Sequence, residues 1–394
     1  MANRTLISGA CLTLSLFFFF PTHNGMALAF IDEAFELAFQ DHNDFGHIPS
    51  DDSVLVKRLS FPIQLGDKTG QQMAGFLYFD SQGFSVCKRH KSLFYLLKCI
   101  QTQSLKNRTL QVLIHGFTYN HTYWDPPHRR LSRFSYARFM ARQGYPVLAL
   151  DLLGTGGSSI PDGDVLNITE SVSSLAQVLI AARALSNPLG GQFDKIVLIG
   201  HSVGTATAVL TTGTFPGIVD FLIATGWSFS PHVVPLSSEL VAASLANPYI
   251  RFPDSVREEL FYFTPSARQP VINFDNRFLA DQFSRGVLIE GLPLLEAMAL
   301  GDFQAIRDLT RIDKVNVPVL VQLGRFDVIA PPLLPDIEAQ LYSNSPDVHV
   351  EILERIGHSF NLHTNRLTSW AGINKWIEER LVKKRAKHNG EVAH

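Results

Sequence analysis

The chain has 394 residues, of which 46% are hydrophobic and 18% are charged. A chain of this length and mixture can bury a large core, which excludes the disordered class. The formal net charge is -2, so the charge balance predicts no nucleic-acid partner.

Residues 1–29 have the pattern of a secretory signal peptide. Arg4 is the only early charge, the stretch 6–20 is largely apolar, and Ala27-Leu28-Ala29 has the small-x-small pattern of a cleavage site. The alternative is a membrane anchor, but the apolar run of about 15 residues is shorter than the ~20 that span a bilayer. We therefore expect a secreted protein, or one in the secretory-pathway lumen, with no membrane span in the mature chain.

The cysteines and sequons agree with this compartment. Cleavage would remove Cys11 and leave Cys87 and Cys99, an even pair that predicts a disulfide bond in an oxidising compartment. The alternative is two buried free thiols. Three Asn-x-Thr sequons of the mature chain are candidate glycosylation sites, at Asn107, Asn120 and Asn167.

After an N-terminal extension, residues 30–52, short apolar runs alternate with helical stretches. Strands are expected at 53–61 and 73–80, with a turn at 66–70 between them. Further strands are expected at 110–114, 146–150, 195–199, 221–224, 317–323 and 348–353. Helices are expected at 130–142, 170–185 and 370–381. This alternation predicts an α/β fold, with a mostly parallel central sheet and helices on both faces.

Two segments fall outside the alternation. Residues 230–305 are rich in proline and aromatic residues, and we expect a helical cap inserted into a core of residues 53–229 and 306–382. Residues 383–394 contain four basic side chains close together, and a solvated tail is the expected structure.

Ser202 is the candidate nucleophile. It lies in Gly200-His201-Ser202-Val203-Gly204, directly after an expected strand and before a stretch of small residues. A Gly-x-Ser-x-Gly sequence in this context is typical of a sharp turn that exposes a reactive serine, since only small residues let the helix approach the strand closely. The alternative is a structural Gly-Ser turn.

A second loop follows the expected strand at 110–114. The sequence His115-Gly116-Phe117 could turn the N–H of Phe117 toward the nucleophile, where it would form an oxyanion hole with the N–H of Val203. We expect His115 to shape this loop rather than to carry a proton.

Asp327 and His358 are the candidate acid and base. Asp327 follows a late strand, and His358 follows the last one, so the chain order is serine, aspartate, histidine. A carboxylate at Asp327 could orient the imidazole and stabilise its protonated form. Asp336 and His363 are the nearby alternatives.

The segment from Asp151 to Ser158 looks like a phosphate-binding loop, because it contains three glycines in Asp-Leu-Leu-Gly-Thr-Gly-Gly-Ser. It lacks the lysine of a P-loop and the spacing of a dinucleotide-binding motif. A structural turn is the better interpretation.

Taken together, these motifs resemble those of the α/β-hydrolase superfamily over about residues 55–382, apart from the cap. They are His115-Gly116, Asp151-x-x-Gly154-x-Gly156, Gly200-x-Ser202-x-Gly204, Gly324-x-x-Asp327 and Gly357-His358. The segment 115–125 is similar to that of secreted fungal α/β-hydrolases of unassigned substrate. The resemblance implies a Ser-His-Asp mechanism with no metal and no organic cofactor.

The serine at position 202 favours acyl chemistry, because epoxide hydrolases and haloalkane dehalogenases of this superfamily carry an aspartate there. We expect a serine hydrolase acting on an ester, lactone or related acyl bond of a mid-sized apolar small molecule, through an acyl-enzyme. The alternatives are a tailoring enzyme of secondary metabolism, which would hydrolyse, cyclise or transfer an acyl group, a protease, and a non-catalytic binder on the same fold.

Overall fold

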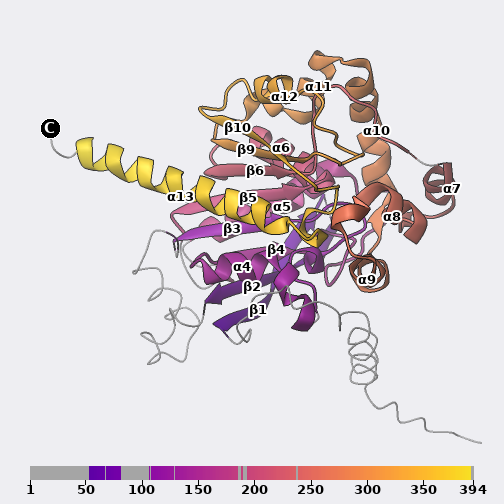
Figure 1. Cartoon of the computed structure of the whole chain (residues 1–394), viewed down its shortest axis with the longest axis horizontal. Helices are drawn as coiled ribbons and strands as arrows, with labels where there is room; N and C mark the ends of the chain where they lie inside the picture. Colours follow the sequence, from indigo (N-terminus) through magenta and orange to yellow (C-terminus); the bar gives the residue numbers. More distant parts are fainter. Residues whose placement is uncertain are drawn as a thin grey trace, which may run out of the picture. The chain divides into compact units, whose positions relative to one another are not determined.

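Eight strands form one central sheet in the computed structural model (Figure 1). Their order is β1-β2-β4-β3-β5-β6-β9-β10. The strands are β1 (Val54–Leu65), β2 (Lys68–Asp80), β3 (Thr109–Ile114), β4 (Val147–Leu150), β5 (Lys195–His201), β6 (Phe221–Thr225), β9 (Val319–Gly324) and β10 (Val348–Leu353). The pairs β1–β2 and β2–β4 are antiparallel and the other pairs are parallel, so the predicted mostly parallel sheet is confirmed.

The structure describes residues 53–66, 68–80, 106, 108–127, 129–184, 188–189, 193–236 and 238–391. The chain divides into two units between His47 and Ile48, and all described residues belong to the second. The expected signal peptide (1–29), the N-terminal extension (30–52), Cys87, Cys99 and Asn107 lie outside the described residues and stay predictions. No helix of the described part is long and apolar enough to cross a membrane.

The apolar runs of the sequence become the centre of the sheet. Every residue of β3, β6 and β9 is buried, whereas β1 at the edge alternates between buried and exposed positions over its second half. Parallel strands covered by helices on both faces must be apolar on both sides, which explains their continuous apolar sequences.

Helices cover both faces of the sheet (Figure 1). On one face α4 (Tyr136–Arg142) packs beside α13 (Arg366–Glu391), and the ring of Trp370 contacts that of Phe139 at 5.4 Å between centroids. On the other face α5 (Ile168–Arg183) packs against α6 (Val203–Thr214). The remaining helical segments of the core are η2 (His121–Tyr123), η3 (Arg129–Phe134), α11 (Phe303–Thr310), η6 (Ile312–Lys314), α12 (Pro335–Leu341) and η7 (Phe360–Leu362).

Two helices differ from the sequence expectation. The helix expected at 130–142 is divided at Ser135, whose Oγ accepts the Arg138 N–H at 3.0 Å and so starts α4 as a new helix. The last helix is longer than 370–381, since α13 extends to Glu391 through part of the expected tail. The lysines and arginines of that segment are good helix formers, which explains the extension.

Residues 230–305, the cap segment, form short helices between β6 and β9. They contain α7 (Ser238–Ala246), α8 (Asp254–Phe261), η4 (Thr264–Ser266), α9 (Gln269–Phe274), η5 (Asp275–Leu279) and α10 (Arg285–Leu300), with β7 (Tyr249–Ile250) paired to β8 (Phe283–Ser284). Pro253 immediately precedes α8, and Pro270 lies in the first turn of α9. Proline is favoured at helix starts because the missing N–H has no partner there, so the proline-rich sequence produces many short helices.

The buried carboxyl group of Glu338 fixes the chain where it leaves β6 toward the cap segment. Its Oε2 accepts the Ser228 hydroxyl at 2.7 Å and the N–H groups of Phe229 at 2.7 Å and Ser230 at 2.8 Å. Burial raises the pKa of Glu338 to about 7, although these hydrogen bonds act in the opposite direction. Between about pH 5 and 6 the folded protein therefore retains a proton on this group that the unfolded chain has largely lost.

This proton predicts a pH-dependent stability. Because the folded pKa of about 7 lies above the ordinary value of 4.5 for a glutamate, the stabilisation is complete below pH 4.5 and is lost as the pH rises through 7. We expect the free energy of unfolding of the wild type to fall by roughly 3 kcal/mol between pH 4.5 and 8 because of this group. Glu338→Gln, which cannot titrate, should not show this fall. Urea unfolding of both proteins at several pH values measures it, with Glu296→Gln, an exposed carboxyl group, as control. An equal difference between wild type and Glu338→Gln at pH 5 and pH 8 would contradict the assignment.

Candidate active site

Ser202 occupies the sharp turn between β5 and α6, with φ 56° and ψ −127°. Such a backbone conformation is strained for a residue with a side chain and persists only where the surroundings enforce it. A Cβ atom on Gly200 would lie 2.5 Å from the Gly204 carbonyl oxygen, and one on Gly204 would lie 2.4 Å from the His115 carbonyl oxygen. The two glycines are therefore steric requirements of the turn.

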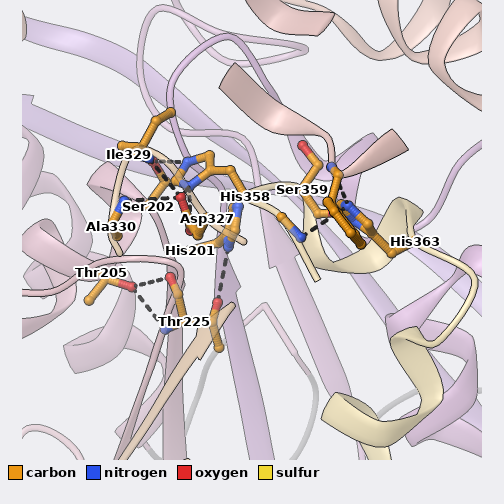
Figure 2. Close-up of polar contacts among 12 residues, drawn as sticks. His201, Ser202, Thr205, Thr225, Asp327, Ile329, Ala330, His358, Ser359 and His363 are labelled. Carbon is orange, nitrogen blue, oxygen red and sulfur yellow. Dashed lines mark hydrogen bonds and ion pairs between the residues drawn. The ribbon is translucent and has the colours of Figure 1, made fainter. Parts of the chain in front are cut away.

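Figure 2 shows the predicted nucleophile, base and acid in one continuous chain of hydrogen bonds. His358 Nε2 lies 2.9 Å from Ser202 Oγ, and His358 Nδ1 lies 2.9 Å from Asp327 Oδ2. Asp327 Oδ1 in turn accepts the N–H groups of Ile329 at 2.9 Å and Ala330 at 3.0 Å. An N–H at Nδ1 pointing to the carboxylate leaves the Nε2 lone pair directed at the serine hydroxyl.

The two alternative residues lie elsewhere. Asp336 is exposed in the first turn of α12. His363 is buried, and its Nε2 accepts the N–H groups of Gly357 and Phe263, each at 3.1 Å. Burial lowers the pKa of His363 to about 4, so the imidazole is neutral near pH 7. It therefore holds the loop of His358 against the cap segment.

The loop after β3 lies directly against the nucleophile. A Cβ atom on Gly116 would be 2.6 Å from Ser202 Cβ and 3.2 Å from Ser202 Oγ. Phe117 and Val203, the expected oxyanion-hole residues, line the same cavity as Ser202. Val203 is the first residue of α6, and its N–H has no carbonyl partner within the helix. The structure thus brings both residues to the site, and their role in binding an oxyanion stays a prediction.

His115 joins this loop to the next one. Its Nδ1 donates to the Gly116 carbonyl oxygen at 2.8 Å, and its Nε2 accepts the Leu152 N–H at 3.1 Å. Burial lowers the pKa of His115, so the ring is neutral and has both nitrogens engaged. These contacts agree with a loop-shaping residue.

The glycine-rich turn closes on its own aspartate. Asp151 Oδ1 accepts the His121 N–H at 2.7 Å, and Asp151 Oδ2 accepts the Gly157 N–H at 2.8 Å. A Cβ atom on Gly156 would lie 2.3 Å from Asp151 Oδ2. The carboxylate is thus held by backbone N–H groups of and beside the turn, and these contacts agree with a structural turn.

Two of the expected glycosylation sites take part in local hydrogen bonds. Asn120 Nδ2 donates to Asp281 Oδ2 at 2.8 Å, and Asn167 Oδ1 caps α5 by accepting the Glu170 N–H at 2.9 Å. Both asparagines are half-buried, and their modification stays a prediction.

His201, beside the nucleophile, is a site residue that the sequence analysis did not single out. Its ring is fully buried, stacks on Tyr123 with centroids 4.5 Å apart, and lies 5.1 Å from the His358 ring. Burial lowers the pKa of His201 well below its usual value. The neutral ring therefore packs beside His358 without adding a competing positive charge. Its position before Ser202 is the only signal for this role in the sequence.

Core and cap side chains line a cavity that contains Ser202 and His358. Apart from these two residues and the indole of Trp227, the lining side chains that the structure describes carry no polar atom, and none of them is charged. They are Phe117, Ile168, Val203, Ala206, Val234, Pro235, Leu236, Phe252, Leu260, Phe261, Val287, Leu288, Gly291, Leu294, Leu295 and Ile329. Among the described residues, no group of three or more His, Cys, Asp or Glu side chains is arranged to hold a metal ion.

The contact at Gly116 predicts a large effect of one methyl group. Gly116→Ala must displace the loop from Ser202, because its Cβ would lie 2.6 Å from that of the serine. We expect kcat for an ester substrate to fall by ~10²-fold, the usual effect of losing one oxyanion donor. Gly291→Ala is the matched control, since its Cβ would meet the cavity residue Ile168 at an ordinary 3.6 Å. Equal kcat values for the two variants in steady-state assays would disprove the close-approach argument.

Comparison with known proteins shows which family the chain is similar to. The model of the alpha/beta hydrolase family matches residues 111–368. Over 145 residues the chain is 30% identical to uncharacterized proteins of Mycobacterium bovis and Mycobacterium tuberculosis, which is 36% of this chain and 37% of theirs. The matched segment thus spans little more than a third of these curated relatives.

Two solved structures share the fold. A putative aryl esterase from Burkholderia cenocepacia is 16% identical, with a TM-score of 0.51 over 82% of this chain and 100% of that one. A peroxisomal alpha-beta-hydrolase from Saccharomyces cerevisiae is 14% identical, with a TM-score of 0.50 over 84% and 89%. At these identities the likeness shows the fold alone.

Proposed function

The chain belongs to the alpha/beta hydrolase family, and from this premise we propose that it is a serine hydrolase that cleaves an ester, lactone or related acyl bond. The observation that carries the proposal is the chain of hydrogen bonds from Ser202 through His358 to Asp327 inside an apolar cavity. A serine activated by an oriented histidine is the arrangement that acyl transfer requires.

The geometry supports the following reaction. Ser202 Oγ attacks the substrate carbonyl carbon while His358 Nε2 accepts the hydroxyl proton, and Asp327 stabilises the imidazolium that results. The N–H groups of Phe117 and Val203 would stabilise the developing oxyanion. His358 then returns the proton to the leaving group, and an acyl-enzyme remains. Water deprotonated by His358 attacks the acyl carbon, the bond from that carbon to Ser202 Oγ breaks as His358 returns the proton to this oxygen, and the acid is released.

The cavity lining supports an uncharged, mid-sized apolar substrate. A charged group placed there would lose its hydration without gaining an ion pair, because none of the described lining side chains is charged. Cyclisation or transfer to a second substrate uses the same acyl-enzyme and differs only in the nucleophile that attacks it. Product analysis with an ester substrate separates these alternatives from hydrolysis.

A fluorophosphonate probe tests the nucleophile. We expect covalent labelling of the folded protein at Ser202, located by peptide mapping, and its loss in Ser202→Ala. Folded protein without label at Ser202 would refute the mechanism.

The acid is tested by Asp327→Asn, which should slow ester hydrolysis by ~10⁴-fold, because an amide favours the wrong histidine tautomer. Asp336→Asn, at an exposed aspartate on α12, is the matched control and should behave as wild type.

We also propose export from the cell, on the basis of the signal-peptide pattern at residues 1–29. Expression of the full chain in a eukaryotic host should deliver protein to the medium with Phe30 as its first residue. Mass spectrometry of the N-terminal peptide measures this directly. Protein that stays inside the cell with residues 1–29 intact would contradict the proposal.

A further inference from the structure

A buried ion pair lies within the cap segment. Arg257 on α8 donates from Nη2 to Asp275 Oδ2 at 2.6 Å, and both side chains are completely buried. Removing two charges from water is costly, and an apolar pair of similar size commonly packs as well or better. Neither residue lines the cavity described above. The contacts of the pair's polar atoms lead along two branches to loops of the site.

One branch of the contacts leads to the proposed base. Asp275 Oδ2 accepts the Tyr119 hydroxyl at 3.0 Å and the Tyr262 hydroxyl at 2.5 Å. Because Tyr119 donates to the carboxylate, its oxygen is free to accept the Ser359 hydroxyl, which lies 2.7 Å away. Ser359 immediately follows His358. The carboxylate of the cap segment is thus linked to the base loop, residues 357–359, through one tyrosine.

The other branch leads to the oxyanion loop, residues 116–118. Arg257 Nη1 donates to the Thr118 carbonyl oxygen at 3.1 Å and also contacts the Thr118 hydroxyl. The N–H of Asp281 donates to the same carbonyl oxygen at 2.8 Å. Thr118 has φ 58°, a left-handed conformation that is costly for a residue with a side chain. It directly follows Phe117, so these contacts hold the backbone that carries the proposed oxyanion donor.

We propose that Arg257, Asp275 and Tyr119 form a clamp that holds the oxyanion loop and the base loop in register across the nucleophile. The three side chains are positioning residues, because none of them lines the cavity. The proposal rests on the function proposed above. Its consequence is that loosening the clamp reduces the rate of the chemical step and leaves the binding of an apolar substrate unchanged.

Two tyrosines offer a matched test. Tyr119→Phe and Tyr262→Phe each remove one buried hydroxyl from Asp275 Oδ2, but only Tyr119 continues to Ser359. Full-length variants would be titrated with the fluorophosphonate probe, and kcat and KM measured per reactive site with a p-nitrophenyl ester. We expect Tyr119→Phe to lower kcat by ~10-fold with KM unchanged, since small displacements at a reacting centre have large effects on rate.

Tyr262→Phe should keep kcat within about twofold of wild type, even where its melting temperature falls as much as that of Tyr119→Phe. Equal kcat values for the two variants, or a loss confined to KM, would overturn the clamp. If the wild type hydrolyses the ester and both variants have its kcat, the clamp proposal is wrong and the proposed function stands. If the wild type neither reacts with the probe nor hydrolyses the ester, both the proposed function and the clamp proposal are wrong.

Discussion

Three stretches of backbone meet at Ser202 at distances that allow no side chain between them. The turn of the nucleophile has a positive φ, and Gly200 and Gly204 let α6 return directly over β5. Gly116 brings the neighbouring loop against the serine in the same way. Every other part of the site depends on this close packing, because it decides where the serine oxygen and the surrounding N–H groups are held. The strain is maintained by a sheet whose central strands are buried on both faces.

Three other histidines of the site are buried near the base, and none of them is hydrogen-bonded to a carboxylate among the described contacts. His115, His201 and His363 are buried, and burial lowers the pKa of each. Each also packs next to, or hydrogen-bonds with, a loop of the site, so each acts as a neutral structural group. Of these four histidines only His358 is hydrogen-bonded to a carboxylate, that of Asp327, which would stabilise its protonated form. The buried histidines of the site therefore have two roles, structural support and proposed base, and the hydrogen-bond partners of each histidine distinguish them.

Local sequence patterns determine which parts of the structure could be predicted. The sheet, the turn at Ser202 and the chain order of Ser202, Asp327 and His358 depend on local patterns, and the structure brings these three residues into contact. The buried network could not be predicted, because its partners are remote: Arg257 and Thr118 are 139 residues apart, and Tyr119 and Ser359 are 240 apart. The division of one helix at Ser135 was missed because a single capping hydroxyl competes with a continuous helical pattern.

The cap segment consequently serves the site in two physically different ways. Its apolar side chains, among them Val234 and Leu295, line the cavity around Ser202, and an apolar lining would strengthen the electrostatic interaction with the proposed oxyanion. Arg257 on α8 and Asp275 on η5 instead bond Thr118 and Tyr119, which connect them to the loops that carry Phe117 and His358. Separating α8 and η5 from these loops would break the hydrogen bonds of Arg257 to Thr118 and of Asp275 to Tyr119, whereas Val233 and Val241 near α7 are already exposed to solvent. Buried hydrogen bonds therefore connect the part of the cap segment around α8 to the loops of the site. The described contacts show no such buried polar connection for the part around α7.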